Sequence, residues 1–167
     1  GEIWVMTSAN LSDEPIAFAN SDAWSRLRRI ADGFLFHDRE IETACDDSVI
    51  RVFDQSMLPI RRSRGYVPMP IQLPGSFADH EEVLAVGGEL KATLCVVKGQ
   101  NAFLGQHLGD VQNRETFAAL TRSARHLSRL YRCQYKTVVA DDHPGYLSRD
   151  WAQRYAKQYD ADFVSVQ

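Results

Sequence analysis

The sequence predicts an α/β fold in two parts, and three observations support this prediction. Short apolar runs of strand length recur along the chain, for example at residues 83–86 and 137–140. Two longer segments, 113–131 and 149–159, place apolar residues three and four positions apart, as an amphipathic helix does. A proline-rich linker at residues 67–82 divides the chain.

The first part is predicted over residues 1–66. Residues 3–6 form an apolar run that predicts a short buried strand and leads into a polar turn. Ser21 or Asp22 can cap a helix, and Gly33 can end it. Two further apolar runs predict strands at residues 34–36 and 48–53.

The second part is predicted over residues 83–167. Strands at 83–86, 93–97 and 102–104 are joined by connections too short for crossover helices, so they predict an antiparallel meander. Asn113 caps the helix that follows, whose arginines we expect to form a solvated face. The remaining elements are expected in this order: strand 137–140, helix 149–159 and strand 163–166.

Composition limits the classes of partner. The chain has 167 residues, 44% of them hydrophobic, and a formal net charge of −3. Because the balance is mildly acidic, we expect neither a direct nucleic-acid partner nor an anionic membrane partner. No apolar run has the length of a membrane span, and the first residues do not have the pattern of a signal peptide. Each half is small for an independent α/β core, and the last predicted strand ends at the chain's final residues, so we expect a piece of a larger protein.

Cysteine usage points to a reducing compartment. Cys45, Cys95 and Cys133 are odd in number and widely spaced, and no Cys-x-x-Cys pair occurs. Neither a zinc ribbon nor a disulfide framework is therefore indicated, and a cytoplasmic location is expected.

Arg61, Arg62 and Arg64 lie within four consecutive positions and are followed by Gly65. A guanidinium group is always charged and suits phosphate oxygens. Three guanidinium groups placed together repel one another unless an anion or carboxylates share the site. The cluster therefore predicts either an anion site or a solvated basic turn paired with local acids.

Two polar segments of the first part are further candidates. Ser8 and Asn10 follow the first predicted strand and can contact a phosphate or a hydrated magnesium ion, or can simply bond to their own turn. Residues 45–51 contain two carboxylates, Ser48 and Arg51 at a strand entry. The carboxylates can hold magnesium or can pair with the arginine cluster, and both roles are compatible.

Loops of the second part carry the remaining candidates. Gly87 and Gly88 allow a tight turn and a close approach to phosphate, and Lys91 adds positive charge, although a plain hairpin turn has the same pattern. The segments after later strands contain residues that can act as bases, ligands or ordinary turn residues: His107, Asp110, Asp142 and His143.

Six segments occur together in this order: VMTSANLSDEPI, HDREIETACDDSVIR, PIRRSRGYVP, VLAVGGELKATL, FLGQHLGDVQN and ADDHPGYLS. Together they resemble the HypF-type carbamoyltransferases that mature [NiFe] hydrogenases, and the resemblance covers nearly the whole chain. Residues 1–66 resemble the C-terminal part of the YrdC-like domain. Residues 83–167 resemble the start of a threonylcarbamoyl-transferase-like domain with an actin/hexokinase-like (ASKHA) fold.

The resemblance implies a two-step reaction. The family uses carbamoyl phosphate and ATP, makes carbamoyl adenylate in its YrdC-like domain, and passes the carbamoyl group to the C-terminal cysteine of a maturation protein, HypE. By the same resemblance, Ser8 and Asn10 contact ATP phosphates, and Ser48 and Arg51 line the adenylate pocket. The arginine cluster would neutralise charge as pyrophosphate leaves. Residues assigned to the first phosphate loop of the second domain are Gly87, Gly88 and Lys91.

Two features depart from the family pattern. Gly105 stands where the family more often has serine, and several family segments do not occur in the chain: an acylphosphatase domain, zinc fingers, a lysine/arginine motif and a histidine-rich metal motif. We therefore expect ATP and magnesium as cofactors here, zinc or iron only in the parent protein, and no turnover by this segment alone. Two alternatives remain open: an O-carbamoyltransferase acting on a sugar hydroxyl, and a non-catalytic module that binds nucleotide or a partner.

Overall fold

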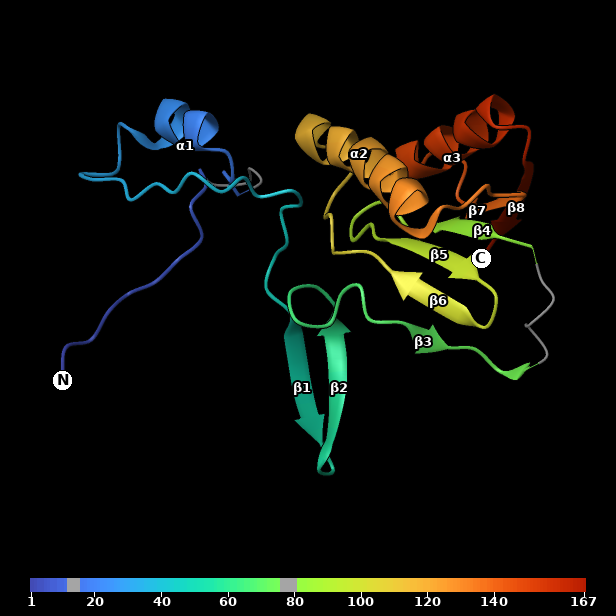
Figure 1. Cartoon of the computed structure of the whole chain (residues 1–167), viewed down its shortest axis with the longest axis horizontal. Helices are drawn as coiled ribbons and strands as arrows, with labels where there is room; N and C mark the ends of the chain where they lie inside the picture. Colours follow the sequence, from blue (N-terminus) through green and yellow to red (C-terminus); the bar gives the residue numbers. More distant parts are fainter. Residues whose placement is uncertain (12–15, 76–80) are drawn as a thin grey trace. The chain divides into compact units, whose positions relative to one another are not determined.

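A computed structural model describes residues 1–11, 16–75 and 81–167. The chain divides into two compact units, Gly1–Ala44 and Cys45–Gln167. The first unit contains one helix, and the described strands all belong to the second (Figure 1). The mixed α/β fold predicted from the sequence is confirmed, and its regular part is concentrated in the second unit.

The helix of the first unit is α1, Asn20–Leu27. It begins after Ala19, so Ser21 and Asp22 lie inside the helix and the predicted cap is wrong. Asp22 instead pairs with Arg26 one turn later, with 2.8 Å between Oδ2 and Nη1. This is the i, i+4 spacing at which opposite charges meet on a helix surface. The helix ends at Leu27, well before the predicted stop at Gly33.

Two predicted strands of the first unit do not form. Residues 3–6 and 34–36 have no strand pairing in the described chain, and Ile3 is 97% exposed. A strand is stable only when another strand satisfies its backbone hydrogen bonds, so an apolar run alone does not make one. Phe34 instead makes ring contacts, with 5.3 Å between its centroid and that of Trp24 and 5.4 Å to that of Phe36.

The second unit begins with a β-hairpin formed by β1, Val49–Phe53, and β2, Ser56–Arg61. The turn residues Asp54 and Gln55 have φ values of 45° and 60°, which a type I′ hairpin turn requires. Strand β1 lies within the strand predicted at residues 48–53, whereas β2 was not predicted and contains Pro59. It is tolerated because the ladder shifts register between Val49 and Ile50, next to the proline.

A six-stranded sheet follows, in the order β3-β6-β5-β4-β7-β8. The predicted meander is confirmed, since β4, β5 and β6 pair antiparallel in sequence. Strands β7 and β8 then add in parallel to β4. The bounds of these strands are β3 Ile71–Gln72, β4 Val83–Val86, β5 Leu94–Lys98, β6 Asn101–Leu104, β7 Thr137–Asp141 and β8 Asp162–Val166.

Strand β3 lies inside the predicted linker. Pro70 precedes it and Pro74 follows it closely, which limits the pairing to two residues. Ile71 pairs with Ala102 of β6, so the linker joins the sheet at its edge rather than remaining unpaired. The polar residues Asp79 and His80 of the predicted linker lie outside the described residues.

Two helices, α2 (Arg114–Tyr131) and α3 (Leu147–Gln158), pack on one face of the sheet (Figure 1). The predicted cap of α2 is confirmed: Asn113 Oδ1 accepts hydrogen bonds from the N–H groups of Glu115 and Thr116. The arginines of the helix are exposed, as predicted: Arg122, Arg125, Arg129 and Arg132.

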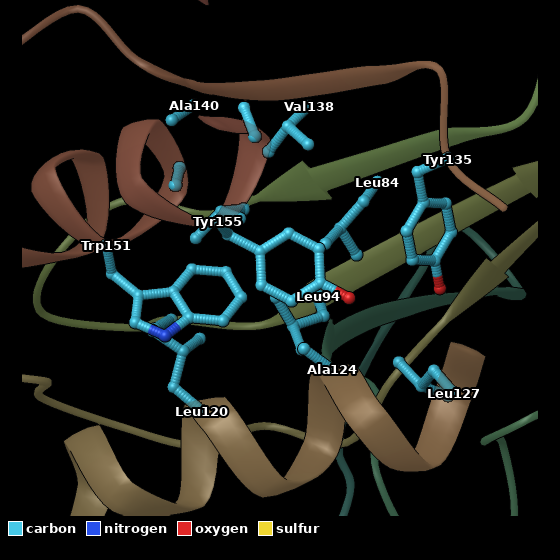
Figure 2. Close-up of a cluster of buried hydrophobic side chains, with 14 of the residues drawn as sticks. Leu84, Leu94, Leu120, Ala124, Leu127, Tyr135, Val138, Ala140, Trp151 and Tyr155 are labelled. Atoms are coloured by element: carbon cyan, nitrogen blue, oxygen red, sulfur yellow. The ribbon is translucent and has the colours of Figure 1, made fainter. Parts of the chain in front are cut away.

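The core lies between the helices and the sheet. Figure 2 shows Trp151 and Tyr155 of α3 packed between Leu120 of α2 and Leu84 of β4. Leu84 and Leu120 have no exposed surface. The indole N–H of Trp151 is satisfied by Thr121 Oγ1 at 2.9 Å, which ties the two helices together.

Lys98 caps the C-terminal end of α2. Its ammonium group donates to the carbonyls of Tyr131 and Arg132 at 2.9 and 3.3 Å and pairs with Glu82 at 2.9 Å. A cation at this position satisfies carbonyls that the helix leaves unpaired. Within the described ranges, no helix is long and apolar enough to cross a membrane.

Candidate functional site

The arginine cluster forms a loop whose charges are balanced by the acidic segment before β1. Arg61 Nη1 lies 2.9 Å from Asp46 Oδ2, and Arg64 Nη1 lies 3.8 Å from Asp47 Oδ1. Arg64 also donates to the carbonyl of Cys45 at 3.0 Å. The pairing of Asp46 and Asp47 with arginines, one of the two predicted readings, is therefore present.

The three arginines differ in accessibility. The side chain of Arg64 is 70% exposed, that of Arg61 is 37% exposed, and Arg62 is half-buried. Arg62 donates to the carbonyls of Tyr66 and Met69 at 3.4 Å, and its Nε is buried with no partner among the described residues. Arg62 therefore shapes the loop, whereas Arg61 and Arg64 present charge to solvent.

Hydrogen bonds of Ser48 hold this loop against the start of the hairpin. Ser48 Oγ accepts from the N–H of Ser63 at 2.9 Å and donates to the carbonyl of Arg64 at 2.8 Å. Ser63 is fully buried, and its hydroxyl lies 3.2 Å from the sulfur of Cys45. Ser48 is thus used to fix the loop. Arg51 lies further along exposed β1, opposite Leu58.

Ser8 and Asn10 form a self-contained turn in the first unit. The Ser8 hydroxyl donates to Asn10 Oδ1, and Asn10 Nδ2 donates to the carbonyl of Leu11 at 2.8 Å. Their hydrogen bonds follow the local-turn pattern that serine and asparagine often adopt. Their contact with a phosphate stays a prediction.

In the second unit, three parallel strands end at the same edge of the sheet. The glycines Gly87 and Gly88 follow β4, Asp142 and His143 follow β7, and Gln167 follows β8. Open α/β sheets usually bind ligands at the carboxyl ends of parallel strands. A pocket of about 280 Å³ lies here, and it is lined by Asp141, Asp142, His143, Tyr146 and Gln167.

The pocket walls are fixed by short contacts. Asp141 Oδ1 accepts from the N–H of His143 at 2.8 Å, and His143 Nδ1 accepts from the N–H of Gly145 at 3.2 Å. Because Nδ1 is an acceptor, the neutral ring carries its proton on Nε2. The ring of His143 stacks on Tyr146 with 4.3 Å between centroids, and Asp142 lies 3.6 Å from Arg149. The wall thus presents carboxylate acceptors beside an imidazole.

Gly87 and Gly88 differ in how much room the structure leaves for a side chain. A Cβ added to Gly87 would lie 3.0 Å from the carbonyl oxygen of Thr93, so the backbone approach at that position excludes a side chain. A Cβ added to Gly88 would lie 3.8 Å from Asp141 Oδ2 and from Tyr146 Cε2, which is ordinary contact. Gly88 therefore borders the pocket region, whereas Gly87 packs closely against the backbone of Thr93. The predicted approach of this loop to a phosphate stays a prediction.

Other predicted residues lie elsewhere in the second unit. Lys91 is exposed, and Asp110 accepts from the N–H of Gln112 at 2.9 Å in the turn before α2. Burial lowers the pKa of His107, and the nearby charges of Arg61 and Lys91 lower it further. His107 therefore lies within electrostatic reach of the arginine loop, and the structure does not bring it to the pocket residues.

Sequence reasoning missed Glu89. This residue is 2% exposed, and its Oε2 accepts from both the N–H and the hydroxyl of Ser148, at 3.2 and 3.4 Å. A glutamate beside Leu90 in a glycine loop has the pattern of a solvent-exposed turn, so nothing local distinguishes it. Only the long-range packing of the loop against α3 buries it.

Comparisons with known proteins agree along the chain. Residues 78–167 match the family model described as the HypF Kae1-like domain, and residues 1–63 match the Sua5/yciO/yrdC model, described as telomere recombination. Carbamoyltransferase HypF of Synechocystis sp. is 43% identical over 91% of this chain, and carbamoyltransferase HypF2 of Cupriavidus necator is 43% identical over 99%. The chain spans 20% of the length of each of these relatives.

Solved structures give the same result. A full-length HypF in a phosphate- and nucleotide-bound form has a TM-score of 0.85 and 39% identity, covering 96% of this chain and 25% of that one. The HypF of T. kodakarensis has a TM-score of 0.87 and 35% identity, covering 97% of this chain and 21% of that one. The resemblance seen in the sequence motifs is confirmed, and the chain belongs to the HypF carbamoyltransferase family.

Proposed function

We propose that this chain is part of an ATP-dependent carbamoyltransferase. Carbamate derived from carbamoyl phosphate attacks the α-phosphorus of ATP, forming carbamoyl adenylate and releasing pyrophosphate. The carbamoyl group then passes to the C-terminal cysteine thiol of a HypE-type maturation protein, with release of AMP and a proton. The resulting thiocarbamate supplies the cyanide ligand of a [NiFe] hydrogenase. The match to relatives named carbamoyltransferase over 99% of the chain supports this proposal.

The single observation that carries the chemical assignment is the exposed, weakly paired Arg64. Its side chain is 70% exposed, and its Nη1 lies 3.8 Å from Asp47 Oδ1, so the ion pair is weak. An incoming phosphate can replace this internal counter-charge and bind the guanidinium bidentately. We assign Arg61 and Arg64 to stabilising pyrophosphate as it leaves, and Arg62 to shaping their loop.

The other predicted contacts of the first step follow from the family assignment. Ser8 and Asn10 are proposed to contact ATP phosphates, and Ser48 and Arg51 to line the adenylate pocket. Such adenylation depends mainly on positioning and electrostatic stabilisation, since the protein contributes no covalent bond.

We assign the pocket at the ends of β4, β7 and β8 to the second step. Its carboxylates and its imidazole are suited to hydroxyl and amine donors, which carbamoyl adenylate carries on its ribose and on its carbamoyl nitrogen. By the family assignment, Gly87, Gly88 and Lys91 are proposed to form a phosphate loop for this ligand, and the side chain of Lys91 is exposed.

The described residues contain no group of three side chains suited to a metal ion, and Asp46 and Asp47 are engaged with arginines. We therefore propose that Mg²⁺ arrives bound to the ATP phosphates, as it commonly does. Zinc or iron is assigned to segments outside this sequence. The three free cysteines, Cys45, Cys95 and Cys133, accord with the proposed cytoplasmic location.

Carbamoyl-phosphate-dependent exchange between ATP and pyrophosphate tests the first step in the full-length enzyme that contains this chain. R64A is expected to abolish most of the exchange while leaving the melting temperature unchanged, because its side chain is exposed. Arg122→Ala on α2 provides a matched control, an exposed arginine whose loss should leave exchange intact. Full exchange by R64A would remove this arginine from the mechanism.

An acceptor assay separates the remaining alternatives. Carbamoylation of a HypE-type cysteine tail supports the proposed acceptor, and carbamoylation of a sugar hydroxyl identifies an O-carbamoyltransferase. ATP–Mg²⁺ binding measured by calorimetry without any exchange would identify a non-catalytic module.

A further inference from the structure

Glu89 lies between the glycine loop and α3, and only half of its carboxylate is satisfied. Oε2 accepts from the N–H and hydroxyl of Ser148. Oε1 is buried and has no hydrogen-bond partner among residues 1–11, 16–75 and 81–167. Burying a carboxylate is costly unless it gains compensating interactions, so packing alone does not account for a glutamate here.

The compensating interaction is at the start of α3. The N-cap residue, Tyr146, makes no side-chain capping hydrogen bond. The N–H of Ser148, the second residue of the helix, is the kind of donor that a capping side chain normally satisfies. Glu89 satisfies it from another segment, and places a carboxylate at the positive end of the helix dipole.

This capping contact joins the two sides of the pocket region. Tyr146, which precedes the helix, lines the pocket and stacks on His143. A Cβ added to Gly88, which precedes Glu89, would lie 3.8 Å from Tyr146 Cε2 and from Asp141 Oδ2, so the loop passes beside both residues. Fixing the side chain of Glu89 to the first turn of α3 therefore fixes the glycine loop relative to the ring of Tyr146.

We infer that Glu89 is a positioning residue for the carbamoyl-transfer step, which it serves by capping α3 from the glycine loop and so holding both walls of the pocket in register. It acts through Ser148 and Tyr146 rather than through contact with the substrate. This inference rests on the proposed function, because it assumes that the pocket belongs to the second step.

The two steps of the proposed reaction supply an internal comparison. In the full-length enzyme, Glu89→Ala is expected to lower the rate of carbamoyl transfer to the acceptor about tenfold, the equivalent of roughly 1.4 kcal/mol in the free energy of activation. ATP–pyrophosphate exchange should remain unchanged, because the arginine loop lies outside this contact. Glu89→Gln keeps a carbonyl oxygen for the N–H of Ser148 and should restore most of the transfer rate.

Two controls complete the design. Glu115→Ala removes an exposed carboxylate from the first turn of α2 and should change neither step. Ser148→Ala removes only the hydroxyl contact, so it gives a milder loss of transfer and remains informative if Glu89→Ala does not fold.

Four results would overturn the inference. If Glu89→Ala lowers ATP–pyrophosphate exchange and carbamoyl transfer equally, Glu89 has only a stabilising role. The same holds if neither rate falls at temperatures below the melting temperature of the variant. Damage by Glu89→Gln as severe as by Glu89→Ala would show that a carbonyl oxygen accepting from the N–H of Ser148 does not hold the loop, which contradicts the inferred cap. If the unaltered enzyme performs neither step, the proposed function fails, and amide hydrogen exchange then tests the contact between Glu89 and Ser148. Glu89→Ala must accelerate hydrogen exchange at the N–H of Ser148. Unchanged hydrogen exchange there would show that Glu89 does not cap the helix.

Discussion

The ion pair between Arg61 and Asp46 must be weak if an incoming phosphate is to replace the carboxylate. The atoms lie 2.9 Å apart, and the side chains are 37% and 38% exposed. At this distance the attraction in water is about 1.4 kcal/mol before side-chain ordering is counted. Measured pairs of this exposure contribute about 0.2–1 kcal/mol. We therefore predict a coupling free energy within that range.

A double-mutant cycle measures this coupling. D46N, R61Q and the double variant are compared by amide hydrogen exchange at Arg64, whose N–H donates to the carbonyl of Asp46 and so reports local opening of the loop. The coupling should fall further in about 1 M salt, where the Debye length is about 3 Å. The same cycle on Arg64 and Asp47, which are 3.8 Å apart and more exposed, should give a value near zero.

A strong, salt-insensitive coupling between Arg61 and Asp46 would contradict this prediction. A value above about 3 kcal/mol, the size expected when one partner of a buried pair is removed, would mean that Asp46 is a permanent part of the loop. Phosphate would then be unable to take its place, and Arg61 would no longer be a candidate for pyrophosphate binding.

Three further predictions concern stability. G87A should unfold at clearly lower urea concentration than G88A, because a Cβ at Gly87 meets a carbonyl at 3.0 Å whereas one at Gly88 has ordinary 3.8 Å contacts. Burial opposes ionisation of Glu82, but hydrogen bonds from Lys98 and a backbone N–H outweigh it and lower the pKa of Glu82. Its contribution to the free energy of unfolding is therefore present above the ordinary pKa of glutamate and is lost as pH falls through the lowered pKa. K98M should make the free energy of unfolding, measured by urea titration, depend less on pH in this acidic range. Burial, reinforced by nearby positive charge, lowers the pKa of His107, so stability should fall as pH drops below the ordinary histidine pKa, and urea titrations between about pH 5 and 8 should show less slope for H107Q.

The second half of the fold could be predicted because its signals are local. The apolar spacing of α2 and its cap, Asn113, identify the helix from neighbouring residues alone. Strands β4, β5 and β6 are joined by short connections, so their pairing follows from sequence order. The offsets at strand ends are one residue, which is within ordinary boundary variation.

The first half was less predictable because its elements depend on distant partners. The apolar runs at 3–6 and 34–36 have strand composition, but composition does not supply a partner. Strand β2 was missed because Pro59 normally interrupts a ladder, and the register shift that accommodates it is a property of the pair rather than of either strand.

The same distinction applies to the candidate site. The acidic and basic segments that hold Asp46 and Arg61 are both visible in the sequence, so their pairing could be anticipated. Glu89 could not be found in this way, because its burial is created by α3, which begins 58 residues later. The roles of the predicted site residues in binding and catalysis stay predictions.

The hairpin of β1 and β2 has a practical consequence. Every residue of β1, and all of β2 but the last, is exposed, and the hydrophobic side chains include Val52, Phe53, Met57 and Ile60. Both outer edges also carry backbone groups that another strand can use. Purified alone, the chain should therefore be colloidally unstable: light scattering should rise with concentration, and a charged substitution such as Phe53→Lys should suppress that rise without changing the melting temperature.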